Sequence, residues 1–288
     1  MADRLDGNRE WREVPGISYR DRMGRVVRNA PEPFRIGRNG VPDYASLLSS
    51  HDYVDPAWLG LRTSIGCYWD RCRFCTQALN AYQARKVEAV VHDMEELHRC
   101  FGATGVRFTD EAVSPSRLSR IADLLIERNS GLSWNSNSRF DGKLTETLCH
   151  TLVRSGCTGL SFGLESINQR VNNLMDKGVD VENAKRTIDI VRKSGLFCFV
   201  NAVIGFPGET EAEMLETVGF LKDSVGDGMQ ASLSVFALNH GSYVYQHPEE
   251  FGVKWIEDAK DFVFKDCYLY SCEDQVPYDV VLNIFETF

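Results

Sequence analysis

The feature that most constrains the fold is a repeated alternation of short apolar runs and amphipathic segments, which begins at Leu61. One amphipathic segment places Ala184, Ile188 and Val191 on a single helical face, as a helix that covers a sheet requires. Six strands with intervening helices predict parallel strands joined by right-handed crossovers. The expected strands are Leu61–Ile65, Gly105–Phe108, Leu132–Asn135, Gly159–Phe162, Phe197–Ile204 and Ala231–Phe236, and the expected helices are Val87–Cys100, Pro115–Arg128, Leu144–Ser155, Val181–Ser194 and Glu211–Ser224.

The predicted fold class is therefore α/β. Six strands are two short of a closed eight-stranded barrel. A partial (β/α)6 barrel and an open doubly wound sheet both fit this number. In either architecture, the loops that follow the strands carry the chemistry, so the site is expected at that edge of the sheet.

We expect the chain to have three parts. These are a hairpin and connector over residues 1–60, the core barrel over 61–240, and a C-terminal segment on the substrate side over 241–288. The hairpin is predicted within residues 14–28, where Asp21–Gly24 supplies turn chemistry. Because a lone hairpin cannot bury a core, it should pack on the main domain or be the remnant of a domain upstream of Met1.

Composition and charge narrow the class of function. The first ten residues are polar and lack the apolar stretch of a signal peptide. The longest nearly apolar run, Leu196–Phe206, falls short of the roughly 20 residues that span a bilayer. We therefore expect a cytoplasmic protein without membrane contact. The net charge of −9 argues against a nucleic-acid partner.

Three cysteines lie within nine positions of the stretch SIGCYWDRCRFC, at Cys67, Cys72 and Cys75. Thiols stay reduced in the cytosol, which argues against a disulfide framework. A structural zinc site needs a fourth protein ligand, and the nearest histidines are at least 16 residues away in the sequence. A [4Fe–4S] cluster on three thiolates leaves one iron free for a ligand. The cysteine spacing alone leaves both metal sites open.

Polar residues follow the later strands and suggest a ligand. Asp110 or Glu111 would neutralise an amine, and Arg139 would bind a carboxylate in bidentate form. Glu165 is placed to bind ribose hydroxyls, and Gly205 allows the backbone to approach a flat ring closely. Amine, carboxylate, ribose and purine are together the parts of S-adenosylmethionine (SAM).

These stretches resemble the radical SAM superfamily. GCYWDRCRFC resembles its cluster-binding loop, with four residues between the first two cysteines where three are usual. FTDEAV, WNSNSRFD, LSFGLES and VIGFPGET resemble the segments that close its later strands, in the same order. The resemblance runs from about Leu61 to Val235 and implies a partial (β/α)6 TIM-like barrel with a [4Fe–4S] cluster and SAM as cofactors.

The resemblance also implies residue roles. Cys67, Cys72 and Cys75 would ligate three irons and form the catalytic centre, and the fourth iron would chelate the amine and carboxylate of SAM. A reduced cluster would then cleave SAM to a 5′-deoxyadenosyl radical, which abstracts hydrogen from a substrate. The implied cofactor-binding residues are Phe74, Ile204, Gly205, Pro207 and Glu209 near the adenine, Asp110 and Glu111 near the amine, Arg139 near the carboxylate, Glu165 near the ribose, and Ser136 without an assigned contact.

A narrower resemblance concerns the flanks of the barrel. VPGISYRDRMGRVVRNAP and FALNHGSYVYQHPEEFGV are similar to stretches of cobalamin-linked radical enzymes, yet the chain has no Asp-x-His-x-x-Gly cobalamin signature. We therefore expect a truncated enzyme, or one whose corrinoid module is a separate protein. Cys267 and Cys272 are expected to be structural thiols rather than ligands of a second cluster.

Three functions remain in competition. The first is a radical SAM enzyme that abstracts hydrogen from a peptide or small metabolite and receives electrons from an external flavodoxin or ferredoxin. The second is a cobalamin-dependent methyltransferase or rearrangement enzyme on the same fold. The third is a zinc-stabilised binding protein without turnover. The sequence names neither the substrate nor the oligomeric state.

Overall fold

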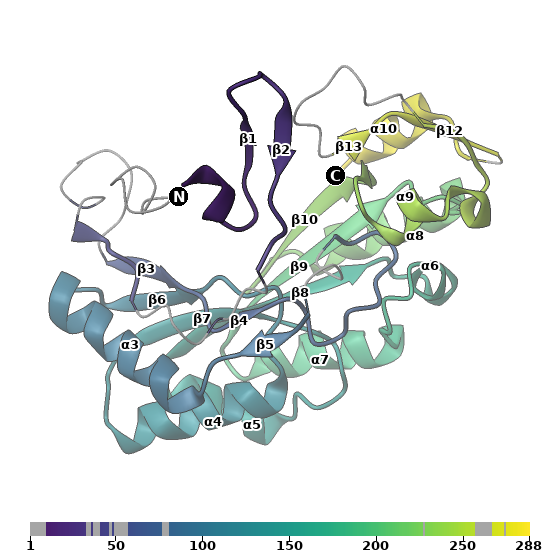
Figure 1. Cartoon of the computed structure of the whole chain (residues 1–288). Coiled ribbons are helices and arrows are strands. Elements are labelled where there is room, and N and C mark those ends of the chain that lie inside the picture. The colour runs from purple at the N-terminus through teal and green to yellow at the C-terminus, as the bar shows by residue number, and fades with distance from the viewer. Residues whose placement is uncertain are drawn as a thin grey trace. The chain divides into compact units, whose positions relative to one another are not determined.

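The protein was described from a computed structural model. The described residues are 10–32, 36, 41–45, 48, 57–76, 81–226, 228–256, 267–273 and 275–288. The chain divides into two compact units, residues 1–38 and 39–288, whose elements are labelled in Figure 1. Each unit is described by itself.

The first unit contains the predicted hairpin. Its elements are η1 (Trp11–Glu13) and the antiparallel strands β1 (Ser18–Arg20) and β2 (Val26–Arg28). The turn forms because the Asp21 carboxylate accepts hydrogen bonds from the backbone N–H of Met23 at 2.8 Å and of Arg25 at 2.9 Å. This local hydrogen bonding is the turn chemistry expected of an aspartate, and the predicted hairpin is confirmed.

The second unit is built on a parallel six-stranded sheet with the order β10-β9-β8-β7-β6-β3. Its strands are β3 (Trp58–Leu61), β6 (Gly105–Phe108), β7 (Ser133–Ser138), β8 (Cys157–Glu165), β9 (Phe197–Ile204) and β10 (Met229–Val235). Within the described residues β3 and β10 are edge strands, so the sheet does not close. The α/β class and the partial barrel are confirmed.

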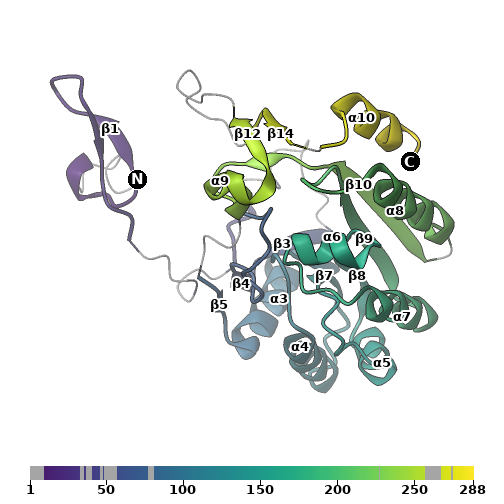
Figure 2. The ribbon, with the colours of Figure 1, turned by 90° about the vertical axis from the view of Figure 1, so that its right-hand side faces the viewer.

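Five helices cover one face of this sheet, as Figure 2 shows. They are α3 (Val87–Phe101), α4 (Pro115–Glu127), α5 (Glu146–Arg154), α7 (Val181–Lys193) and α8 (Glu211–Ser224). Their ends follow local chemistry. The α8 helix begins with a capping box between Thr210 and Glu213, and α3 ends at Gly102 in a left-handed conformation.

The remaining elements of this unit are short. They are β4 (Ser64–Ile65) and β5 (Gln83–Ala84), α6 (Gln169–Leu174), β11 (Leu238–Asn239), α9 (Tyr243–Gln246), η4 (Pro248–Phe251), β12 (Val253–Ile256), β13 (Cys267–Tyr268), β14 (Tyr270–Cys272) and α10 (Tyr278–Glu286). None of the helices in the described ranges is both long and apolar enough to cross a lipid bilayer.

The two faces of the sheet differ in character. On β9, the helix-facing positions Cys198, Val200, Ala202 and Ile204 are fully buried in the main apolar core. The alternate positions of the same strand point to the opposite, inner face, because side chains alternate along a strand. Strand register places Gly159 beside Phe197, Ser161 beside Phe199 and Gly163 beside Asn201 on that inner face. The core therefore lies under the helices, and the inner face is free to form a site.

The predicted first strand, Leu61–Ile65, is wrong. The sheet strand is β3, which shares only Leu61 with it, and residues 64–65 form β4, which pairs with β5. The parallel ladder stops because the backbone N–H of Thr63 donates to the Asp110 carboxylate at 2.9 Å instead of to a strand. A side chain 47 residues away thus ended the strand, which a local pattern does not reveal.

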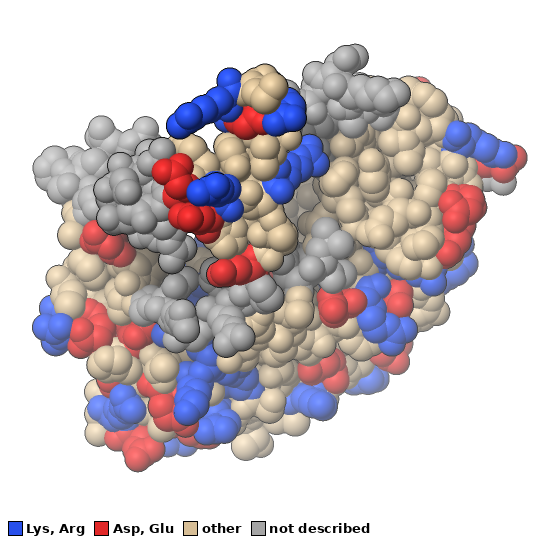
Figure 3. All heavy atoms as spheres, viewed as in Figure 1, with Lys and Arg blue, Asp and Glu red and all other residues tan. Residues whose placement is uncertain are grey.

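Charged side chains mix on the helical layer. In Figure 3 lysine and arginine atoms alternate with aspartate and glutamate atoms over α3 and α4. Arg120 pairs with Glu88 at 3.0 Å, and Arg128 pairs with Glu95 at 2.9 Å, so two ion pairs link these helices. Exposed pairs of this kind contribute about 0–1 kcal/mol each.

Candidate cofactor site

A cavity of about 270 Å³ lies at the C-terminal ends of the central strands. It brings together side chains from the cysteine loop, from β7, β8 and β9, and from the segments after β6 and α6. The residues that line it are Cys67, Cys72, Phe74, Cys75, Glu111, Ala112, Asn137, Ser138, Arg139, Ser161, Phe162, Gly163, Glu165, Lys177 and Asn201. The three thiols and four other predicted site residues, Phe74, Glu111, Arg139 and Glu165, thus meet in one place.

The cysteine loop is held by backbone and indole hydrogen bonds. The N–H of Arg73 donates to the Met175 carbonyl at 2.9 Å, and the indole N–H of Trp69 donates to the Asp176 carbonyl at 2.8 Å. On its other side the Arg73 carbonyl accepts from the N–H of Val244 at 3.0 Å. The loop is therefore anchored between the segment after α6 and helix α9.

The three thiols of the cysteine loop line one cavity. Cys72 is buried and the other two thiols are half-buried. Three soft donors spaced around one cavity suit an iron–sulfur cluster.

Arg139 lies against the buried thiol. Its Nη1 is 3.9 Å from the Cys72 Sγ, and its Nη2 donates to the Lys177 carbonyl. Its guanidinium carbon is 4.8 Å from the centre of the Trp69 ring. Burial raises the pKa of the Cys72 thiol, while the Lys177 and Arg139 cations act in the opposite direction. The cations thus favour the thiolate that a metal requires.

Glu165 and Lys177 form a buried ion pair at the cavity wall. The Lys177 Nζ donates to the Glu165 Oε1 at 2.5 Å, and the same ammonium lies 5.6 Å from the centre of the Phe74 ring. Lys177, Asn137 and Asn201 were missed as site residues. The signal for Asn201 was present, because a polar residue interrupts the apolar run of β9, whereas Lys177 follows a short helix and gave no local signal.

The neighbouring carboxylates Asp110 and Glu111 have different surroundings. Asp110 is buried, and its carboxylate accepts from the N–H of Thr63 at 2.9 Å, from the Thr63 hydroxyl at 2.8 Å and from the Ser64 hydroxyl. It therefore holds the start of the cysteine loop and does not line the cavity. Glu111 lines it, 3.6 Å from Arg62. Burial raises the pKa of Glu111, and Arg62 partly offsets this effect.

Ser136 does not line the cysteine cavity either. It lies on the face of β7 that carries the buried Trp134, because the two are separated by two residues along a strand. Its hydroxyl donates to the Asn137 carbonyl at 3.0 Å. Ser136 instead borders a second cavity further along the sheet.

The predicted adenine-side segment forms a tight turn after β9. The Glu209 Oε2 accepts from the N–H of Gly205 at 2.7 Å and of Phe206 at 3.1 Å, and Gly205 has a φ of +81°. The Glu209 Oε1 is buried without a hydrogen-bond partner among the described residues. Burial raises the pKa of Glu209 to about 7, although both N–H donors oppose this. Ile204, Gly205, Pro207 and Glu209 do not line the cysteine cavity.

The other cysteines lie elsewhere. Cys149, Cys157 and Cys198 belong to the main apolar core under the helices. Cys267 and Cys272 border a separate cavity beside β10 and α10. Of the cysteines in the described ranges, only the triplet lines the cavity at the strand ends.

An open parallel barrel with a three-cysteine loop at its strand ends defines an iron–sulfur protein of the α/β class. The chain belongs to the Radical SAM superfamily, whose family profile matches residues 61–221. Membership implies a [4Fe–4S] cluster and SAM as cofactors, and the soft donor set of the cavity fits the cluster.

Known proteins are similar to this chain in sequence and in fold. The chain is 27% identical over 230 residues to an uncharacterized methyltransferase of Pyrococcus horikoshii. The aligned region covers 77% of this chain and 50% of the relative. The structure of the cobalamin-dependent SAM radical enzyme OxsB with aqua-cobalamin matches with a TM-score of 0.71 and 18% identity, over 94% of this chain and 46% of that chain.

A second solved structure has the same fold. The radical SAM methyltransferase TsrM from Kitasatospora setae, with cobalamin and a [4Fe–4S] cluster bound, has a TM-score of 0.63 and 17% identity. The match covers 87% of this chain and 52% of that chain. The chain therefore spans about half the length of the proteins that it matches.

Proposed function

We propose that this chain is the cofactor-binding core of a radical SAM enzyme that abstracts hydrogen from a small-molecule or peptide substrate. The observation that carries the proposal is the convergence of three thiols, two buried cations and two carboxylates in one cavity. When bound, the cluster and SAM supply a one-electron reductant and a 5′-deoxyadenosyl radical. An external donor of the flavodoxin or ferredoxin type would provide the electron.

The chain's residues would divide the work of binding. Cys67, Cys72 and Cys75 would hold three irons. Arg139 and Lys177 are the cations that line the cavity, and they would offset the negative charge of the thiolates and of a ligand carboxylate. For the amine of SAM we propose Glu111 rather than Asp110, because the Asp110 carboxylate already accepts three hydrogen bonds.

Two further roles concern the nucleotide. Glu165 would accept hydrogen bonds from the ribose, and its pairing with Lys177 holds the carboxylate in the cavity wall. The turn after β9 would border the adenine beyond the cysteine cavity, and the N–H bonds of Gly205 and Phe206 to the Glu209 carboxylate fix the shape of this turn. The walls of the barrel would exclude water and keep stray hydrogen donors from the reacting centre.

The test uses anaerobically reconstituted protein with dithionite and SAM. Release of 5′-deoxyadenosine is expected from the wild type and is expected to be lost in Cys72→Ala. The matched control is Cys100→Ala, because that thiol is exposed on α3 and lies outside the cavity. Normal release from Cys72→Ala, or about one zinc and no iron per chain in the wild type, would refute the proposal.

A second function is cobalamin-dependent methyl transfer. It is favoured by the relatives, since the P. horikoshii protein is named a methyltransferase and both solved structures contain cobalamin. The chain would then act with a corrinoid held outside the described fold. In that case S-adenosylhomocysteine should form only when cobalamin and a reductant are added together. Formation of 5′-deoxyadenosine alone, unaffected by cobalamin, would favour hydrogen abstraction without methyl transfer.

A further inference from the structure

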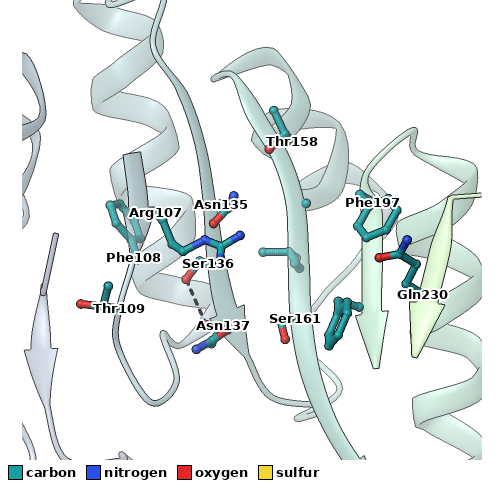
Figure 4. A pocket seen from close by; sticks show the side chains of 13 residues that line it. Arg107, Phe108, Thr109, Asn135, Ser136, Asn137, Thr158, Ser161, Phe197 and Gln230 are labelled. Atoms are coloured by element: carbon teal, nitrogen blue, oxygen red, sulfur yellow. Dashed lines mark hydrogen bonds between the residues drawn. The ribbon is translucent and has the colours of Figure 1, made fainter. Parts of the chain in front are cut away.

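A second cavity, of about 510 Å³, occupies the inner face of the sheet. It shares Asn137 and Ser161 with the cysteine cavity and extends from there toward the N-terminal ends of the strands. Figure 4 shows its side chains coming from β6, β7, β8, β9 and β10. The two cavities are therefore adjacent, with the cysteines at one end.

Strand register explains this lining. The inner-face positions form two rows across the sheet, which are Arg107, Asn135, Gly159 and Phe197 in the first, and Asn137, Ser161, Phe199 and Gln230 in the second. The second row is nearer the cysteines, by the roughly 7 Å that two residues of a strand span. Arg107 thus lies at the end of the cavity that is remote from the metal site.

The inner face carries few bulky side chains. Gly159 adds none, and a Cβ at this position would lie 2.8 Å from the Phe197 carbonyl oxygen. The inward positions of a closed barrel are usually filled by bulky branched residues. Here they carry amides, a hydroxyl and a guanidinium. Asn137 donates to the Asp110 carbonyl at 2.8 Å, and Ser161 accepts from Asn201 at 3.2 Å.

The charge of the cavity selects for an anion. Among the described residues, Arg107 is the one charged side chain that lines it. Arg107 is exposed, and within the described residues its guanidinium has neither a hydrogen bond nor an ion pair with another side chain, so it is available to a ligand. No carboxylate in the described part of the chain lines the cavity to repel a negative group. A cationic ligand would meet only repulsion from Arg107.

The remaining lining gives the ligand an apolar part. Phe197 is 40% exposed, and Phe199 lies on the same inner face one row nearer the cysteines. An exposed phenylalanine on a concave face is suited to contact with a flat or aliphatic group. The neutral polar groups of Asn135 and Gln230 would fix its orientation.

The inner-face cavity is large enough for a small organic ligand. Pockets for such ligands hold about 300–1,000 Å³, and this cavity lies within that range.

We propose that the inner-face cavity is the substrate pocket and that the substrate is a small organic carboxylate. Its carboxylate binds Arg107 in bidentate form, its apolar part lies against Phe197 and Phe199, and its reacting end points past Asn137 and Ser161 toward the cysteines. This inference rests on the proposed function only for the position of the reacting centre.

The test uses anaerobic holoprotein with SAM and a matched set of probes. The probes are 3-phenylpropionate, 3-phenylpropanamide, 3-phenylpropylamine and phenyl phosphate, and binding is measured by ligand-observed NMR titration. The carboxylate should bind at least about tenfold more tightly than the amide, because a charge-assisted bidentate pair is lost, and the amine should bind least. Arg107→Met should remove this preference, and Arg107→Lys should retain part of it.

The control variant is Arg120→Met, since Arg120 lies on α4 and pairs with Glu88 on the helical layer. It should bind the probes like the wild type. Equal binding of carboxylate and amide, or an unchanged preference in Arg107→Met, would overturn the proposal. Tighter binding of phenyl phosphate would overturn the carboxylate assignment. Iron content and 5′-deoxyadenosine release of the same samples test the proposed function separately, because probe binding does not depend on them.

Discussion

Lys177 and Glu165 form an ion pair at the wall of the cysteine cavity, with Nζ and Oε1 2.5 Å apart and side chains only 10% and 8% exposed. The pair forms although Glu165 adopts a φ of +64°, which non-glycine residues seldom do. It also depends on Gly163, because a Cβ there would lie 2.6 Å from the Lys177 Nζ. The backbone of Glu165, the space left at Gly163 and the Lys177 ammonium thus together place one carboxylate in the cavity wall.

Removal of the ammonium should destabilise the fold strongly. Lys177→Met leaves the Glu165 carboxylate buried without its partner, which costs about 3–5 kcal/mol. The free energy of unfolding in urea measures this. Lys185→Met removes an exposed pair with Glu182 and should cost at most about 1 kcal/mol. A Lys177→Met variant as stable as Lys185→Met would show that Glu165 finds another partner.

Loss of Arg139 should make the bound cluster harder to reduce. A buried cation and an N–H donor beside a ligand sulfur stabilise the reduced state, and Arg139 Nη1 lies 3.9 Å from the Cys72 Sγ. Arg139→Met should therefore shift the midpoint potential to more negative values in an EPR-monitored redox titration.

Arg71→Met is the matched control for Arg139. Its guanidinium lies 5.1 Å from the centre of the same Trp69 ring, but it is exposed and pairs with Asp176. The midpoint potential of the cluster in the Arg71→Met variant should equal that of the wild type. If Arg139→Met also keeps the wild-type potential while the KM for SAM rises, Arg139 serves the SAM carboxylate and not the cluster.

Substitution of Gly178 should displace the cysteine loop. Gly178 has a φ of +65°, and a Cβ there would collide with the Trp69 ring. Gly195 has a φ of +83°, and a Cβ there meets nothing within 4 Å. Both alanine variants pay about 1–2 kcal/mol for the left-handed backbone, but only Gly178→Ala should also lower the iron content after reconstitution. Equal iron content in the two variants would contradict this.

Glu209 should make stability fall as pH rises. Burial raises its pKa in the folded protein to about 7 from the usual 4.5, so the folded state binds the proton more tightly than the unfolded state. Its contribution is fully present below about pH 4.5 and is lost as pH approaches 7, by roughly 3 kcal/mol in total. Glu209→Gln should flatten this dependence in urea unfolding between pH 5 and 8.

Glu211→Gln provides the comparison, because Glu211 is exposed in the first turn of α8. It should keep the wild-type pH dependence. If the free energy of unfolding of Glu209→Gln changes with pH as steeply as that of the wild type, the buried Glu209 carboxyl is not the group that titrates.

Local patterns predicted much of the framework. The bounds of β6, β9 and α8 agree with the sequence prediction, because period-two and helical spacing of apolar residues encode which face is buried. The sequence prediction ended β7 and β8 too early, at Asn135 and Phe162, whereas the strands continue to Ser138 and Glu165. Ser136 and Ser138 continue the alternation of β7, but their small polar side chains resemble loop residues.

The cysteine triplet and its loop could be found without a structure, because all three ligands lie within nine residues. The sequence by itself therefore determined the α/β class, the order of most strands and helices, and the three-cysteine loop. Only the tertiary structure decided which of Asp110 and Glu111 faces the cavity, that Lys177 pairs with Glu165, and that Arg107 lies on the inner face. The physical reason is that parallel register and burial bring together residues far apart in the chain, and hydrogen bonding then decides which of them remain available to a ligand.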